Sequence, residues 1–466
     1  MKKPLLSFAL ATTLALGAIG SQPVFAKPAE ATEKQGIKVF DHKVIKEINA
    51  ENIYNNIVTL SKNPRIAGTE SEDQAVQYVK KQFESYGYDV EVQPFQYYGY
   101  TSPHTTEFKV DGYNGTLNPS AFTYTVSGNV AGELVYAGLG TVDELRNTDL
   151  TGKIALIKRG DISFAEKVLN AAERGAAGVV IFNNVAGTIN GTLGGANDKY
   201  VPAVSLTKAE GDVLADQLAS GEKLVATLKI EGARTGESTS HNVIATKKPT
   251  NKKKDTNNII VISSHHDSVP GAPGANDNAS GTAMTLELAR VFKNVPTDTE
   301  IRFITFGAEE LGLIGSTYYV NNLSDDEINR TIANFNLDMV GSRAAGDLVM
   351  LTLDGKPNLV TELAQASSSR LNGSVTPFGQ GGRSDHVPFA EAGIPAALFI
   401  HSPSEPWYHT PEDTSDKISI EKLQDVAEIV AAAAYEQAQF DNMGPKPKKG
   451  KKEKAKADFY HEQDVR

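Results

Sequence analysis

The segment from Ile259 to Gly281, IIVISSHHDSVPGAPGANDNASG, places the strongest constraint on how this chain folds. It opens with four apolar, β-branched residues, and a run of this length and composition predicts a buried strand rather than a helix. His265 and Asp267 follow the strand, and Asp277 precedes an expected helix. Loops at the carboxyl ends of parallel strands are where α/β folds hold their sites. The segment therefore predicts an α/β domain with metal-ligand residues at one edge of its sheet.

Composition limits what that domain belongs to. The chain has 466 residues, 40% of them hydrophobic, which is enough for two domains with separate cores. Its net charge of -11 disfavours nucleic acid as a partner. The lysine-rich segment 247–258 has no interleaved aromatic residues to stack on bases, so we expect a solvated hairpin loop there. The absence of cysteine excludes disulfides, thiolate zinc sites and a cysteine nucleophile.

The compositions of the two ends of the chain are not typical of a folded domain. Residues 1–26 combine two early lysines, an apolar stretch over 5–19 and a small-x-small cleavage site over 24–26, which predicts a secretory signal peptide. The apolar stretch is shorter than the roughly 20 residues of a membrane span, and no span is expected elsewhere. Residues 442–466 form a basic tail that we expect to be disordered and that is a candidate for association with an anionic cell wall. These features predict a secreted, extracellular bacterial protein.

A second, β-rich unit is expected between residues 121 and 236, inserted into the first domain (37–120 and 237–441). Short strands dominate this segment, and one helix interrupts them, starting at a capping box formed by Ser163 and Glu166. The run GKIALIKRGDISFAEKVLNAAERGAAGVVIFNN, followed by VPAVSLTKAEG, resembles a protease-associated (PA) domain. That resemblance implies a lid or a guide for substrate, and an inert spacer remains the alternative.

Further metal-ligand candidates follow apolar runs later in the chain. The adjacent Glu309 and Glu310 come just after the run 301–306, Asp338 ends the run 332–337, and His409 lies beyond the run 394–400. Consecutive carboxylates at a strand end point in different directions, so one can bind a metal while its neighbour moves protons.

The candidate metal ligands are more informative as a set than singly. Two histidines and three carboxylates are nitrogen and oxygen donors that suit zinc or a similar divalent ion. With one carboxylate shared, they suffice for two metals. Two metals about 3.5–4 Å apart activate a water and polarise a carbonyl group. The sequence therefore predicts hydrolytic metal chemistry.

The motifs HHDSV, GANDNASG, GAEELGLIGS, NLDMVGS and YHTPEDT, in this order, closely resemble the M28 family of dizinc aminopeptidases. The likeness extends from about Arg65 to Tyr435, interrupted only by the inserted unit. It implies the zinc exopeptidase fold, a mixed and largely parallel sheet with helices on both faces. It also implies an enzyme that removes amino-terminal residues from peptides.

The resemblance also implies a role for each residue that matches a family motif. His265 and Asp338 would hold one zinc, Glu310 and His409 the other, and Asp277 would bridge both. Asp267 would orient His265, a function that zinc-bound histidines usually need. The resemblance further makes Glu309 the general base and Tyr408 the donor to the tetrahedral oxyanion.

Some expectations stay open at this point. Arg383, in the family-like segment Arg383-Ser384-Asp385-His386, is a candidate substrate contact, with a structural hydrogen-bond network as the alternative. Calcium is a further candidate ion without a located site. Carboxypeptidases and glutaminyl cyclases resemble relatives of the same fold, and a peptide-binding protein without activity is the alternative from another class.

Overall fold

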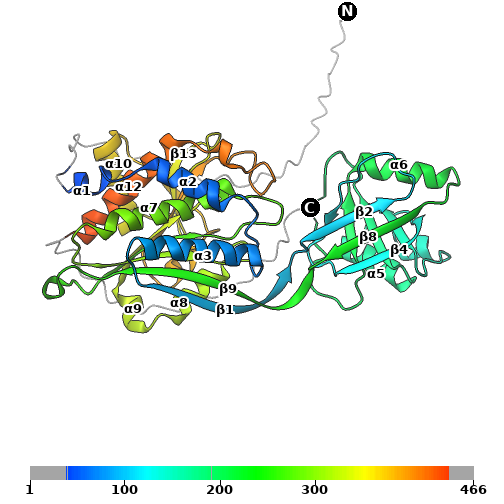
Figure 1. Ribbon diagram of the computed structural model, residues 1–466, viewed down its shortest axis with the longest axis horizontal. Coiled ribbons are helices and arrows are strands. Elements are labelled where there is room, and N and C mark those ends of the chain that lie inside the picture. Colours follow the sequence, from blue (N-terminus) through cyan, green and yellow to red (C-terminus); the bar gives the residue numbers. More distant parts are fainter. Residues whose placement is uncertain (1–37, 39, 190, 440–466) are drawn as a thin grey trace, which may run out of the picture.

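The computed structural model describes Lys38, residues 40–189 and residues 191–439. The predicted signal peptide (1–26) and basic tail (442–466) lie outside these residues. The described chain forms two units, each built on its own sheet and joined by a pair of long strands (Figure 1). None of the helices in this part of the chain has both the length and the apolar character that crossing a membrane requires.

The first unit is built on an eight-stranded sheet with the order β1-β9-β11-β10-β12-β15-β13-β14. Its strands are β1 (Val90–Thr101), β9 (Arg234–Lys247), β10 (Ile259–His265), β11 (Glu300–Phe306), β12 (Thr331–Leu337), β13 (Asp347–Thr352), β14 (Phe378–Gln380) and β15 (Ala396–Ser402). The central strands β11, β10, β12 and β15 pair in parallel, while β1, β9 and β13 add antiparallel pairs. The sheet is thus mixed, as predicted.

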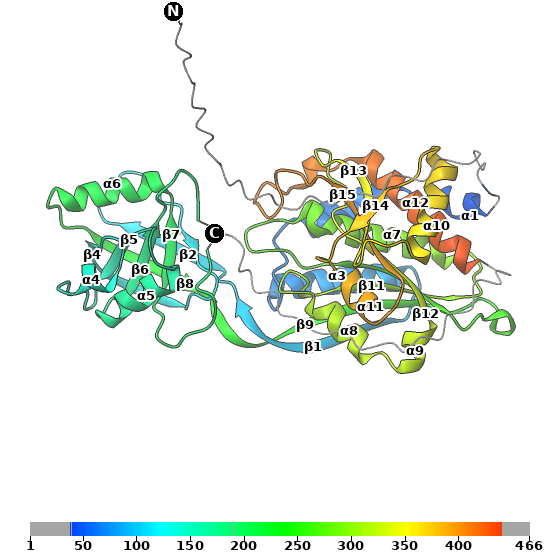
Figure 2. The same cartoon turned by 180° about the vertical axis from the view of Figure 1, so that it is seen from behind.

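Helices cover both faces of this sheet, and Figure 2 shows α8, α9 and α11 from the side opposite to Figure 1. The helices and short turns of this unit are α1 (Asp41–Ile45), α2 (Ala50–Leu60), α3 (Glu70–Ser85), η1 (Lys252–Lys254), η2 (Ala275–Ser280), α7 (Gly281–Lys293), α8 (Ile314–Asn322), α9 (Asp325–Arg330), α10 (Leu359–Asn372), α11 (His386–Glu391), η3 (Ser415–Lys417) and α12 (Ile420–Ala438). The predicted architecture, a mixed α/β sheet between helices, is confirmed.

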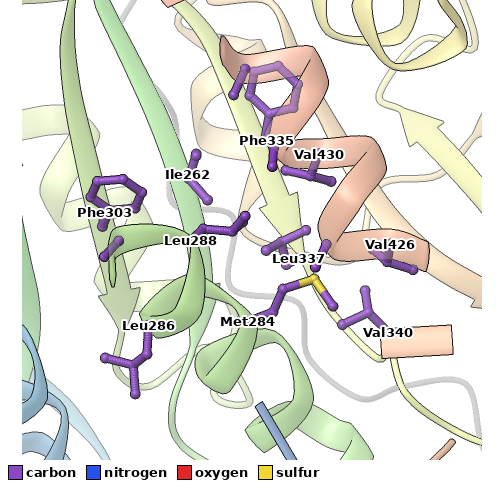
Figure 3. Packing of buried hydrophobic residues seen from close by; sticks show 14 of the residues in the cluster. Ile262, Met284, Leu286, Leu288, Phe303, Phe335, Leu337, Val340, Val426 and Val430 are labelled. Carbon is purple, nitrogen blue, oxygen red and sulfur yellow. The ribbon is translucent and has the colours of Figure 1, made fainter. Parts of the chain in front are cut away.

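The apolar run at 259–262 is buried on both faces of the sheet. Ile260 and Ile262 pack in a core with α7 and α12, whereas Ile259 and Val261 pack in a second cluster with α8 and α11. Figure 3 shows the first core, where Ile262 lies near Leu288 of α7. A strand that is buried on both sides has no polar face, which explains why the sequence shows an unbroken apolar run instead of alternation.

The second unit is built on a seven-stranded sheet with the order β2-β8-β4-β5-β6-β7-β3. Its elements are β2 (Thr105–Val110), β3 (Ser120–Ala121), β4 (Gly128–Tyr136), α4 (Val142–Leu145), β5 (Ile154–Lys158), α5 (Phe164–Glu173), β6 (Gly178–Phe182), β7 (Ala203–Leu206), α6 (Lys208–Ala219) and β8 (Val225–Glu231). The predicted capping box at the start of α5 is present, with Ser163 accepting from Glu166 N and Glu166 accepting from Ser163 N.

Two expectations about the chain path need correction. The sequence placed residues 105–110 in the first domain, but β2 pairs with β8 in the second sheet, where Phe108 and Val110 join its core. The second unit therefore begins before residue 121, because the strand partner of β2 is β8, which belongs to the second sheet. The segment 247–258 is not a hairpin loop either, since β11 lies between β9 and β10 in the sheet.

Candidate metal centre and active site

The predicted ligands come together at the carboxyl edge of the first sheet. His265 is the last residue of β10, and Asp338 follows β12, the parallel neighbour of β10. Glu310 lies four residues beyond β11, which is the parallel neighbour on the other side. Asp277 lies in the irregular turn η2, and His409 lies in the loop after β15. Parallel strands end at one edge, so residues far apart in the sequence meet there.

The first ligand group consists of His265, Asp277 and Asp338, all of them buried. His265 Nε2 lies 3.4 Å from Asp277 Oδ1 and 3.4 Å from Asp338 Oδ1. The three ligand atoms lie within 4.8 Å of one another, which suits a single cation.

The second ligand group consists of Asp277, Glu310 and His409. His409 Nε2 lies 3.1 Å from Asp277 Oδ2 and 3.1 Å from Glu310 Oε2. The two oxygens of Asp277 therefore face different groups, Oδ1 the first and Oδ2 the second. This is the geometry that a bridging carboxylate requires.

The position of Glu309 is compatible with two roles, that of a metal ligand and that of a general base. Its Oε2 is 3.8 Å from His265 Nε2, and a third group of His265, Glu309 and Glu310 also has ligand atoms within 4.8 Å of one another. Geometry alone thus allows Glu309 to bind a cation or to remain free as a base beside it.

Several ligand atoms are buried without any hydrogen-bond partner. They include Nε2 of His265, Oε1 of Glu310, Oδ1 of Asp338 and Nε2 of His409. Each buried polar atom left unpaired costs free energy. Coordination of a divalent cation by this nitrogen and oxygen set would satisfy those atoms, and the donor types fit zinc.

Negative charge is crowded in the site. Burial, followed by the nearby Asp277, raises the pKa of Glu310 to about 7. Burial also raises the pKa of Glu309 well above its usual range, although His265 opposes this. Burial lowers the pKa of His409, but the carboxylates of Asp277 and Glu310, each 3.1 Å from its Nε2, outweigh this effect and raise the pKa to about 10. The pKa of Asp277, in contrast, is lowered, because its burial is outweighed by the two histidines beside it. Buried carboxylates gathered this closely are a cluster that divalent cations stabilise.

Asp267 connects two parts of the site. Its Oδ1 lies 3.4 Å from His265 Nδ1 and accepts a hydrogen bond from Glu309 N at 3.1 Å, while Oδ2 accepts from Glu310 N at 3.2 Å. This buried carboxylate therefore holds the turn that carries the two glutamates and lies close to the imidazole ring of His265.

The remaining predicted residues lie at the margin of the site. Tyr408 is half exposed, and its ring stacks on that of His409 with centroids 3.7 Å apart. Arg383 is exposed, beside the buried Ser384. His266, the chain neighbour of His265, is buried, with Nδ1 3.1 Å from Thr305 Oγ1.

Three buried residues in contact with the ligand loops were given no role from the sequence. Ser384 Oγ donates to Asp338 Oδ2 at 2.8 Å. Asp413 accepts from the backbone of Asp277 at 3.0 Å. Arg65 is fully buried and donates to the carbonyl oxygens of Leu60, His266, Pro273 and Gly274. Ser384 and Asp413 lie inside motifs that the sequence did single out, but nothing in those motifs says which groups they bond.

Two histidines and several carboxylates converging at the edge of an α/β sheet define a metal-dependent hydrolase. Residues 242–434 match the family described as Peptidase family M28, and residues 130–214 match the PA domain. Aminopeptidase YwaD of Bacillus subtilis (strain 168) is 42% identical over an alignment of 429 residues, and the match covers 88% of this chain and 89% of that protein. This chain belongs to peptidase family M28.

Solved structures show the same relationship. The aminopeptidase from Aneurinibacillus sp. strain AM-1 is 59% identical, with 86% of this chain and 96% of that chain covered and a TM-score of 0.61. BSAP, a zinc aminopeptidase from Bacillus subtilis, is 40% identical, with 86% and 97% covered and a TM-score of 0.66. The predicted family, the PA domain and the enzyme class, a metalloaminopeptidase, are confirmed.

Proposed function

We propose that this protein is a secreted zinc aminopeptidase that uses two zinc ions to hydrolyse the first peptide bond of peptides with a free amino terminus. The observation that carries the proposal is the pair of ligand groups that share Asp277 through its two oxygens. His265, Asp277 and Asp338 would hold one ion, and Asp277, Glu310 and His409 the other. When bound, zinc ions at such sites polarise the scissile carbonyl and lower the pKa of water.

Glu309 is the proposed general base. Its carboxylate is almost fully buried beside both ligand groups, and burial raises its pKa, which makes it a better proton acceptor than an ordinary carboxylate. It takes a proton from the attacking water and delivers it to the leaving amine. Asp267 supports this role because it holds the backbone amide of Glu309 and the ring of His265.

Two residues at the margin are proposed to contact substrate. The hydroxyl of Tyr408 donates to the oxyanion that forms on the scissile carbonyl, and its half-exposed position beside His409 is consistent with access to substrate. The exposed Arg383 contacts the peptide backbone. The carboxyl oxygens of Glu309 and Asp338 are the groups proposed to attract the free amine of the substrate.

The location of the protein is part of the proposal. The signal-like residues 1–26 direct export, and the basic tail 442–466 associates with the cell wall. Aminopeptidase YwaD, which matches most of this chain, is a bacterial protein. Calcium remains a candidate ion to be tested by its effect on activity and stability.

The test compares leucyl p-nitroanilide with the same compound carrying an acetylated amine, alongside the zinc content of the purified chain. We expect hydrolysis of the free-amine compound only, with two zinc ions per chain. Hydrolysis of carboxyl-terminal residues would support the carboxypeptidase alternative. Cyclisation of glutaminyl peptides with one zinc ion would support the cyclase. Peptide binding without any turnover would support a non-catalytic binding protein.

A further inference from the structure

The turn η2, which carries Asp277, begins with three amides whose acceptors lie outside the turn. Asp277 (φ -111°, ψ 93°) and Asn278 (φ -132°, ψ 46°) have non-helical dihedral angles, and Ala279 N donates within the turn, to Gly274 O at 3.0 Å. Buried backbone N–H groups must find an acceptor elsewhere. In this turn the acceptor comes from a distant part of the chain.

Asp413 supplies three acceptors to three consecutive amides of that turn. Its carbonyl oxygen accepts from Ala275 N at 3.1 Å, Oδ1 accepts from Asn276 N at 2.8 Å, and Oδ2 accepts from Asp277 N at 3.0 Å. Asp413 is buried, with 1% of its surface exposed. Both oxygens of a buried carboxylate are therefore committed to the backbone of one ligand-bearing turn.

The same loop also carries the ligand His409. A tight turn links the two residues, with Thr410 N donating to Trp407 O at 3.0 Å and Asp413 N donating to Thr410 O at 3.1 Å. Asp413 thus joins the loop that presents His409 to the turn that presents Asp277. These are two of the three members of the second ligand group.

The other side of the turn is held by a positive charge. Arg65 donates to the carbonyl oxygens of Pro273 at 2.6 Å and Gly274 at 2.9 Å, immediately before the amides that Asp413 binds. The carboxylate of Asp413 binds the amides of the turn, and the guanidinium of Arg65 binds the two carbonyl groups that precede them. Together these bonds fix the orientation of the backbone before Asp277. A neutral acceptor with a single oxygen would leave one of the two side-chain bonds unmade.

From these contacts we infer that Asp413 is a positioning residue, which aims the carboxylate of Asp277 so that its two oxygens face both ligand groups. The inference deepens the proposed dizinc function and rests on it. Asp413 does not touch substrate. Residues that orient metal ligands typically change metal affinity by about 10- to 100-fold when they are replaced.

The test is Asp413→Asn, with Glu412→Gln as the matched control. The asparagine keeps the size of the side chain but turns one acceptor into a donor that faces a backbone N–H. Glu412 is the exposed neighbour, so its change removes the same charge without touching η2. Zinc binding to the chelator-treated full chain is measured by calorimetry, and thermal unfolding is measured with and without zinc. We expect zinc affinity to fall roughly 10- to 100-fold in Asp413→Asn, and to stay at the wild-type value in Glu412→Gln.

A merely structural role gives a different pattern. It would lower the unfolding temperature of the zinc-free chain and leave zinc affinity unchanged, and that result would overturn the inference. Because the readout is zinc binding, a wild-type chain without aminopeptidase turnover would count against the proposed function and leave this inference standing.

Hydrogen exchange of the wild-type chain keeps the inference testable if Asp413→Asn does not fold. The amides of Asn276 and Asp277 are expected to remain protected after zinc is removed, because Asp413 holds them independently of the metal. Protection that disappears with zinc would mean that the ions position the turn, and it would refute the assignment.

Discussion

Replacing Glu309 with glutamine is the sharpest test of how this site works. Glu309→Gln keeps the size and shape of a side chain that is 8% exposed, so the neighbouring ligands need not move. It removes the group proposed to transfer the proton. A positioned general base contributes about 10²- to 10⁴-fold in rate, which corresponds to roughly 3–5 kcal/mol of activation free energy.

The expected result is therefore a fall in kcat of about 10²- to 10⁴-fold, with KM within roughly threefold of wild type because substrate binding is retained. The assay is steady-state hydrolysis of leucyl p-nitroanilide, with the zinc content measured on the same samples. The exposed Glu412→Gln serves as the control for loss of one carboxylate.

Two results would contradict the reasoning. If Glu309→Gln retained wild-type turnover, Glu309 would not be the base. If turnover fell together with the loss of a zinc ion, Glu309 would be a ligand, as its distance of 3.8 Å from His265 Nε2 also allows.

Three further predictions concern the surroundings of the site. Asp267→Asn, which loses an acceptor for the amides of the two glutamates and disturbs His265, should weaken zinc binding by about 10- to 100-fold in calorimetry. Arg65→Ala leaves buried carbonyl oxygens unpaired and should lower the free energy of unfolding by at least about 3 kcal/mol in urea titrations. Burial lowers the pKa of His386 and of His401 to about 4, so the unfolded chain binds more protons as the pH falls from about 6.5. The free energy of unfolding should therefore fall between about pH 6.5 and 4, and His401→Gln should reduce that slope.

Each of these predictions has an outcome that would refute it. Unchanged zinc affinity in Asp267→Asn would mean that the imidazole of His265 is oriented by its packing alone. The exposed Lys62→Ala is the control for Arg65→Ala, and equal stability of the two variants would show that the buried guanidinium is replaceable. A slope that is the same with and without His401 would mean that this imidazole is protonated in the folded chain.

The convergence of the candidate ligands could be predicted because most of them lie at or beyond the end of an apolar run that is typical of a buried strand. His265 and Asp338 end such runs, and parallel pairing then brings them to one edge. The order of the strands could not be predicted, because an apolar run that is buried on both faces has no sequence pattern that specifies which strand pairs with it. For this reason β11 was not expected to lie between β9 and β10.

The residues that hold the ligands were harder to predict from the sequence. Asp413 acts on amides 136 and 137 positions away along the chain, and Ser384 acts on a carboxylate 46 positions away. Such bonds depend on the approach of two loops in three dimensions, which no local pattern records. The start of the second unit was misplaced for a similar reason, since β2 is short and its partner β8 lies more than a hundred residues later.

The pairing of β1 with β9 has a consequence for how this architecture can be rearranged. Thr101 and Arg234 are cross-strand partners, so the chain departs for the second unit and returns from it at adjacent points. A short turn in place of residues 102–233 would close the two strands into an ordinary hairpin, with the remaining strands of the larger sheet keeping their neighbours. The second unit is thus an insertion between two paired strands, and its loss, gain or exchange would not change the order of the strands that carry the candidate ligands.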